Sequence, residues 1–123
     1  GKYVFLELTD ATNVYSNRET NVIPNLKDEF KFVQFVTICV GNTEHEMLAL
    51  QRKMNIDWEL GRISMSSQTL EDYRIKSLPL FFIIDPDGKF YAAPAEDPTK
   101  GAQQELMVLK EKLRAKSKRG VGR

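Results

Sequence analysis

The chain has 123 residues, of which 41% are hydrophobic and 28% charged, the balance of one soluble globular domain with an ordinary core. Eighteen Lys and Arg residues stand against seventeen Asp and Glu residues, a formal net charge of +1 that gives no reason to expect nucleic acid as a partner. The longest apolar stretch, Leu78 to Ile84, is far shorter than the roughly 20 residues of a membrane helix, and no basic-then-apolar leader precedes Tyr3. We therefore expect no membrane span in this segment.

The first third of the chain predicts a strand, a bent helix and a second strand. Val4 to Leu8 is rich in β-branched and aromatic residues, and a polar loop follows it. We expect a helix to begin near Ser16 or Asn17, with Ser16 as its N-cap, and Pro24 to bend it. Phe32 to Val40 is nearly continuous in apolar residues, as in a central strand covered on both faces. Two strands joined by a helix predict a parallel crossover.

The middle of the chain predicts a second helix and a less regular segment. Thr43 and Glu46 have the spacing of a capping box, so we expect a helix to start at this point. Ile56 to Ser67 alternates apolar and polar residues, which indicates a short strand or an extended segment. Thr69 to Ile75 is compatible with a short helix.

The end of the chain predicts a hairpin and a closing helix. Asp85-Pro86-Asp87-Gly88 has the residue order of a tight turn and separates two apolar runs. The last helix is expected to close one domain over residues 1–115, and residues 116–123 are expected to form a basic, disordered tail. The apolar stripe of that helix consists of Ala102, Leu106, Leu109 and Leu113.

This order of elements resembles the thioredoxin fold and, within it, the TlpA/ResA-like thiol-disulfide oxidoreductases related to the AhpC/TSA family. Three stretches carry the resemblance: Gly1 to Leu6 as first strand, Ile23 to Leu26 in the first helix, and Tyr73 to Lys89. The resemblance implies a three-layer α/β/α fold with a central mixed sheet, a C-terminal β-hairpin and flanking helices. It also implies a bacterial protein of the periplasm or cell envelope.

The redox motif of that family, WCxxC, has no counterpart here. Counting back from the first-helix match, its positions fall on Tyr15, Ser16, Asn17, Arg18 and Glu19. No neighbouring register restores a cysteine. A hydroxyl or carboxylate cannot form the mixed disulfide through which thiol-disulfide exchange passes, and peroxidase chemistry also needs an activated cysteine. The resemblance therefore implies the fold without the dithiol chemistry.

The resemblance also marks a candidate groove. In the family, the proline before the hairpin is cis and lies beside the redox cysteines, and Pro79, preceded by Leu78, matches it. A cis X-Pro bond is uncommon, so this is a specific expectation. Tyr15 and Pro79 would form part of the groove, with Trp58 and Tyr73 as further candidates. Packing in the core or on the surface explains each of these aromatic residues at least as well.

Isolated residues give no catalytic centre. Cys39 lies in the most hydrophobic strand, where burial would raise its pKa, so we expect a packing role. His45 has no second His or Cys at ligand spacing and is expected at the surface. Ser16 has no recognisable general base, and Glu19 is expected to favour the helix dipole near the helix start. We predict no metal site and no cofactor.

Three functions remain open. We favour a redox-inactive module that binds a polypeptide, or makes contact between domains or subunits, near Tyr15–Glu19 and Leu78–Pro79. The alternative is a thiol-disulfide oxidoreductase that uses Cys39 or a cysteine outside this segment. The third is a structural appendage of a larger exported bacterial protein. The sequence leaves the binding partner and the oligomeric state open.

Overall fold

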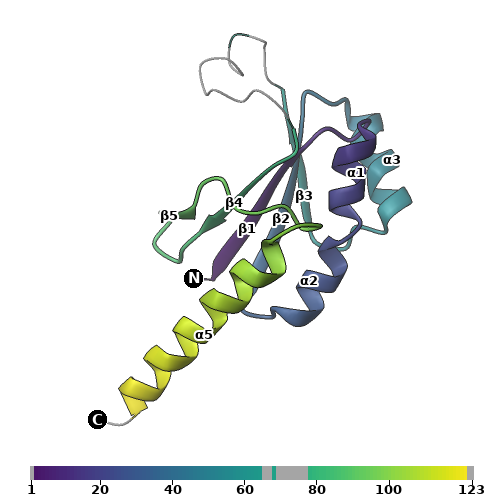
Figure 1. Cartoon of the computed structure of the whole chain (residues 1–123). Coiled ribbons are helices and arrows are strands. Elements are labelled where there is room, and N and C mark those ends of the chain that lie inside the picture. Colours follow the sequence, from purple (N-terminus) through teal and green to yellow (C-terminus); the bar gives the residue numbers. More distant parts are fainter. Residues whose placement is uncertain (1, 65–67, 69–77, 122–123) are drawn as a thin grey trace.

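Five strands form one mixed sheet in the part of the chain that the structure describes, residues 2–64, 68 and 78–121 of a computed structural model (Figure 1). The strand order is β3-β2-β1-β4-β5. Neighbouring strands are parallel from β1 to β3, whereas β4 runs antiparallel to β1 and β5 antiparallel to β4. The strands are β1 (Tyr3–Thr9), β2 (Val33–Val40), β3 (Glu59–Ile63), β4 (Leu80–Ile84) and β5 (Phe90–Ala92).

Two short helices, rather than one bent helix, connect β1 to β2. These are α1 (Val14–Thr20) and α2 (Ile23–Glu29). Pro24 stands in the first turn of α2, where the missing N–H would have no helical partner in any case. The helix therefore divides ahead of the proline instead of bending at it. The parallel crossover from β1 to β2 is confirmed.

The first helix begins earlier than expected. Asn13 Oδ1 accepts hydrogen bonds from the N–H groups of Tyr15 at 2.8 Å and Ser16 at 3.1 Å, so Asn13 is the N-cap. The prediction of Ser16 as N-cap was wrong. Asn is as good a cap as Ser, and the turn from Asp10 to Asn13, closed by a 3.1 Å backbone hydrogen bond, places Asn13 first. Ser16 is instead fully buried in the first turn of the helix.

The capping box predicted for the next helix is confirmed. α3 (Glu44–Met54) has Thr43 as its N-cap. Thr43 Oγ1 accepts from the N–H of Glu46 at 3.1 Å, and Glu46 Oε1 accepts from the N–H of Thr43 at 2.9 Å. The segment that follows contains the short strand β3 at the sheet edge. The short helix predicted over 69–75 lies outside the described residues.

The hairpin of β4 and β5 is present, and the last helix is longer than expected. α5 (Ala102–Val121) continues through 116–121, so the predicted domain boundary at residue 115 falls inside a helix. Lys, Arg and Ala are good helix formers, and no glycine or proline interrupts the run before Gly120. Among the helices of the described ranges, none combines the length and apolar character needed to cross a membrane.

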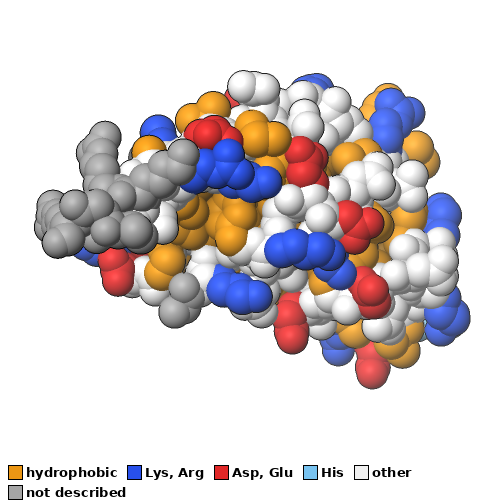
Figure 2. Space-filling view, turned by 90° about the horizontal axis from the view of Figure 1, so that it is seen from below, with side chains coloured by type: hydrophobic (Ala, Val, Ile, Leu, Met, Phe, Trp, Pro, Cys, Tyr) orange, Lys and Arg blue, Asp and Glu red, His pale blue; other side chains and the backbone are white. Residues whose placement is uncertain are grey.

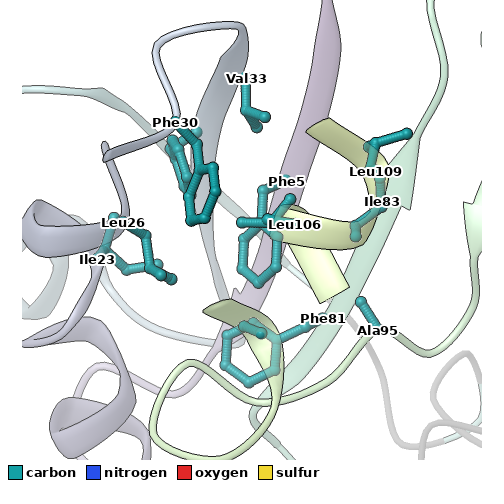
Figure 3. Close-up of a cluster of buried hydrophobic side chains, with 12 residues drawn as sticks. Phe5, Ile23, Leu26, Phe30, Val33, Phe81, Ile83, Ala95, Leu106 and Leu109 are labelled. Carbon is teal, nitrogen blue, oxygen red and sulfur yellow. The ribbon is translucent and has the colours of Figure 1, made fainter. Parts of the chain in front are cut away.

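The main core lies between one face of the sheet and the helices α2 and α5 (Figure 3). Phe5, Phe81 and Ile83 contribute from the strands, Ile23, Leu26 and Phe30 from α2 and its C-cap, and Leu106 and Leu109 from α5. The predicted apolar stripe of α5 is therefore confirmed. A second cluster places Cys39 of β2 beside Leu50 of α3.

Candidate functional site

A cavity of about 310 Å³ lies between α1, Pro79 and the segment that leads to α5. Its lining consists of Tyr15, Arg18, Glu19, Pro79, Asp97, Thr99 and Lys100. The Leu78–Pro79 peptide bond is cis, as the resemblance implied for Pro79, and the Ala93–Pro94 bond, for which no prediction was made, is cis as well. The structure therefore brings three of the five predicted motif positions together with the predicted proline.

The other predicted residues lie elsewhere. Ser16 is fully buried and does not line the cavity, and Asn17 lines a separate cavity of about 260 Å³ between α1 and α3, which His45 also lines. Leu78 is half-buried and does not line the candidate cavity. Trp58 lines a third cavity, at the opposite end of the sheet. Tyr73 lies outside the described residues.

Glu19 forms one wall of the candidate cavity and joins α1 to the segment before α5. Its carboxylate accepts two hydrogen bonds from Thr99, at 2.9 Å from the backbone N–H and at 2.6 Å from the hydroxyl. Because α1 begins at Val14, Glu19 stands in the last turn of the helix and not near its start. The expected interaction of Glu19 with the N-terminal helix dipole was therefore wrong. Hydrogen bonds to an ionised acceptor are among the stronger ones, so this wall is well fixed.

The mouth of the cavity carries an exposed aromatic ring and two cations. The Tyr15 side chain is 69% exposed, and the Arg18 guanidinium lies 5.6 Å from the centre of its ring. Lys100 Nζ lies 3.7 Å from Asp97 Oδ2. Within residues 2–64, 68 and 78–121, Arg18 forms no ion pair with a carboxylate. Its guanidinium donors are therefore available to an incoming group at the cavity mouth.

The loop before α1 is held by its own polar side chains. Asp10 Oδ1 accepts from the backbone N–H of Thr12 at 2.9 Å, from its hydroxyl at 2.8 Å and from Asn42 Nδ2 at 3.1 Å. Asn42 Oδ1 in turn accepts from the N–H of Ala11 at 2.9 Å. Although partial desolvation alone would raise the pKa of Asp10, the bonds from Asn42 and Thr12 bring it below its ordinary value. The loop that positions the start of α1 is thus pinned to the end of β2.

Glu7 is fully buried in β1 beneath α1, and sequence analysis did not single it out. Its two carboxylate oxygens accept from the hydroxyls of Thr20 and Thr37, each at 2.9 Å. Thr37 Oγ1 also accepts from Trp58 Nε1 at 2.9 Å. Burial raises the pKa of Glu7 to about 7, against the opposing effect of the two hydroxyls. The available signal was an acidic residue between Leu6 and Leu8 in an otherwise apolar strand.

The two isolated residues behave as predicted. Cys39 is fully buried against the cluster around Leu50, and burial, with smaller contributions from the charges of Glu7 and Asp10, raises the pKa of its thiol to about 11. The thiol is therefore protonated and shielded at neutral pH, which confirms the packing role. His45 is exposed on α3, as expected.

Comparisons with known proteins identify the fold. No family model and no curated protein matches the chain. A Bacteroides vulgatus protein proposed to be a thiol-disulfide oxidoreductase superposes with a TM-score of 0.72 at 18% identity, over 89% of this chain and 76% of its own. A thiol-disulfide oxidoreductase of Bacteroides fragilis gives 0.68 at 20% identity, over 85% and 81%. A secreted disulfide oxidoreductase of Mycobacterium tuberculosis gives 0.63 at 15% identity, over 87% and 81%.

The chain has a thioredoxin-like fold. The mixed sheet, the hairpin and the flanking helices expected from the resemblance are all present. In this thioredoxin-like chain α1 starts with its N-cap at Asn13, so the start of the helix, Asn13 to Ser16, only partly overlaps the predicted motif positions Tyr15 to Glu19. Neither stretch contains cysteine, and Cys39 is the single cysteine of the sequence. The chain therefore has the fold of its solved relatives without a CxxC motif.

Proposed function

We propose that this domain is a redox-inactive member of the thioredoxin-like group that binds an extended polypeptide at the cavity between α1 and Pro79. The observation that carries the proposal is a formed cavity at the first helix with no sulfur beside it. Asn13 is the N-cap of α1 and Ser16 stands in its first turn, where a thiolate would be needed. The Asn13 side chain caps the helix, and Ser16 Oγ lies 3.5 Å from the N–H of Asp10. Without a thiolate at this place, the cavity can bind a polypeptide but cannot exchange disulfides with it.

The lining of the cavity supports a polypeptide rather than a cofactor as ligand. A volume of about 310 Å³ is at the small end of ligand pockets and suits one or two side chains of a bound segment. Tyr15 offers an exposed aromatic surface and Arg18 a planar set of donors, two residue types enriched at protein recognition sites. The two hydrogen bonds from Thr99 to Glu19 fix this wall of the cavity in the unbound protein.

The alternative, an oxidoreductase that uses Cys39, has less support. Cys39 is fully buried, does not line the cavity, and its thiol has a pKa of about 11. Exchange requires a thiolate that can reach a disulfide sulfur. A reactive role would therefore require the strand β2 to open first.

We further propose that the domain acts in the periplasm or cell envelope of a bacterium, as part of a larger exported protein of the TlpA/ResA-like, AhpC/TSA-related branch. The support is the similarity to bacterial thiol-disulfide oxidoreductases, one of them described as secreted. Cell fractionation with an antibody against the domain tests this location. Recovery in the cytoplasmic fraction would contradict it.

A binding experiment with an unfolded polypeptide tests the main proposal. Reduced, carboxymethylated ribonuclease A has no thiol and no stable fold, so it reports polypeptide binding without redox chemistry. Titrated into the ¹⁵N-labelled domain, it is expected to shift the amide resonances of Tyr15, Arg18 and Glu19. The double variant Tyr15→Ala/Arg18→Ala should lose most of the affinity.

A matched control separates the groove from the surface of α1 in general. Val14 is as exposed as Tyr15, at 69%, and does not line the cavity, so Val14→Ala should bind like the wild type. Shifts that avoid α1 and the residues around Pro79, or an equal loss of binding in the Val14 variant, would contradict the proposal.

A further inference from the structure

The cavity that Trp58 lines has a volume of about 650 Å³ and lies at the end of the sheet opposite Pro79. It sits where β1, β2 and β3 begin, the end of the molecule seen in Figure 2. β3 starts opposite Val36, so Val33 to Phe35 of β2 has a strand neighbour only on the β1 side. The cavity is therefore a notch in the edge of the sheet, at the place where β3 has not yet begun.

The floor of the notch contains an oriented tryptophan. Val33 and Phe35 are buried core residues that also line the notch. Trp58 lines it as well, and its Nε1 donates to Thr37 Oγ1 at 2.9 Å, which fixes the direction of the indole. Lys27 Nζ lies 5.2 Å from the centre of the indole ring. Because Val33 and Phe35 are buried, the half-buried Trp58 and Leu60 are the apolar side chains that the notch presents to solvent.

The rim of the notch carries lysine ammonium groups that are not all paired with carboxylates. Three lysines line it, Lys2, Lys27 and Lys31, against the carboxylates of Asp57 and Glu59. Lys27 is held by Asp57 at 2.7 Å, whereas Lys31 makes only an exposed 3.8 Å pair with Asp28, a kind of pair that contributes little. Figure 2 shows lysine and arginine side chains on this end of the molecule interspersed with hydrophobic and acidic ones.

Two amide side chains add uncharged donors to the lysines. Gln34 and Gln51 line the notch, and within the described ranges neither they nor Lys2 form a side-chain hydrogen bond. Amide and ammonium donors beside a half-buried aromatic ring are the elements of a pocket for an amphipathic anion, and the volume is in the range of small-molecule sites.

We infer that this notch binds a small organic anion: a carboxylate or phosphate joined to an aromatic or aliphatic ring. In this proposal the ring lies against Trp58 and Leu60, and the anionic group faces Lys2 and Lys31. The polypeptide groove at Pro79 is at the other end of the sheet, so this site neither requires the proposed function nor depends on it.

Trp58 makes the inference directly testable, because it is the one tryptophan of the sequence and its indole N–H gives a single resonance in a ¹⁵N spectrum. The probes are 2-naphthoate, 2-naphthyl phosphate and the neutral 2-naphthalenemethanol. A saturable shift of the indole resonance with one or both anions is the expected result, and the stronger anion distinguishes carboxylate from phosphate as the preferred group.

Charge variants test the role of the rim. Lys2→Gln/Lys31→Gln should weaken the binding of the better anion roughly five-fold and leave the response to the neutral alcohol unchanged. Lys89→Gln/Lys116→Gln removes the same charge at exposed positions that do not line the notch and should bind like the wild type. The absence of any shift, an equal response to the neutral alcohol, or an equal loss in the control variant would overturn the inference.

Discussion

Glu19 and Thr99, separated by 80 positions in the sequence, are joined by two hydrogen bonds of 2.9 and 2.6 Å. This pair ties the end of α1 to the segment before α5 and forms one wall of the candidate groove. The groove is therefore a tertiary feature, built from two distant segments and Pro79, and its shape depends on a contact that no local pattern contains.

The contact between these residues should be measurable as stability. Thr99→Val removes the hydroxyl that donates to Glu19 and leaves the backbone bond, so we expect the free energy of unfolding to fall by about 1–2 kcal/mol. Thr99→Ser keeps the hydroxyl and should recover most of the loss. Urea denaturation of the three proteins makes the comparison, and equal midpoints for wild type and Thr99→Val would contradict the assigned role.

The buried Glu7 predicts a pH dependence of stability. Its pKa is about 7 in the folded chain and near 4.5 when unfolded, so the folded state holds the extra proton between those values. The stability contributed by protonated Glu7 is therefore present at low pH and lost as the pH rises through about 7, by roughly 3 kcal/mol.

Glu7→Gln removes this titration. Between pH 5 and pH 8, the stability of the variant should fall by less than that of the wild type, which urea denaturation at both pH values would measure. Glu44→Gln, on the exposed start of α3, is the control and should follow the wild type. Parallel curves for wild type and Glu7→Gln would show that Glu7 does not titrate in this range.

The Cys39 thiol should be unreactive in the native protein. It is fully buried and its pKa is raised to about 11, so at pH 8 it is both protonated and inaccessible. We expect no reaction with an aromatic disulfide reagent within minutes in buffer and one equivalent in urea. A thiol that reacts at similar rates in both conditions would contradict the packing role.

The start of α1 gives a further test. Asn13→Ala should lower the free energy of unfolding by about 1 kcal/mol, because two N–H groups lose their cap, and Asn13→Asp should preserve it. Thermal denaturation is sufficient to rank the variants. If Asn13→Ala were as stable as the wild type, the helix would not depend on this cap.

Local signals were sufficient for much of the fold. The spacing of Thr43 and Glu46 identified the start of α3, and the turn at 85–88 identified the hairpin, because in each case neighbouring residues satisfy one another. The prediction that Pro24 interrupts the helix was correct, but the chain forms two helices with Pro24 in the first turn of the second, and not one bent helix. Asn13 and Ser16 were indistinguishable by propensity, and the preceding turn decided between them.

The candidate site was less predictable. Tyr15, Arg18, Glu19 and Pro79 came from the resemblance and do share a cavity. Asp97 and Thr99 complete it from a polar connection that gave no chemical signal. Glu7 had a signal, a charged residue in a buried strand, but its partners Thr20 and Thr37 lie on two other elements and only the fold brings them together.

An insulin-reduction assay of this chain, with dithiothreitol as reductant, tests the central claim most directly. Because no cysteine lies at the first helix and Cys39 is buried, we predict that insulin is reduced at the rate of dithiothreitol alone, for the wild type and for Cys39→Ala alike. Catalytic turnover by the wild type that disappears in Cys39→Ala would contradict the account.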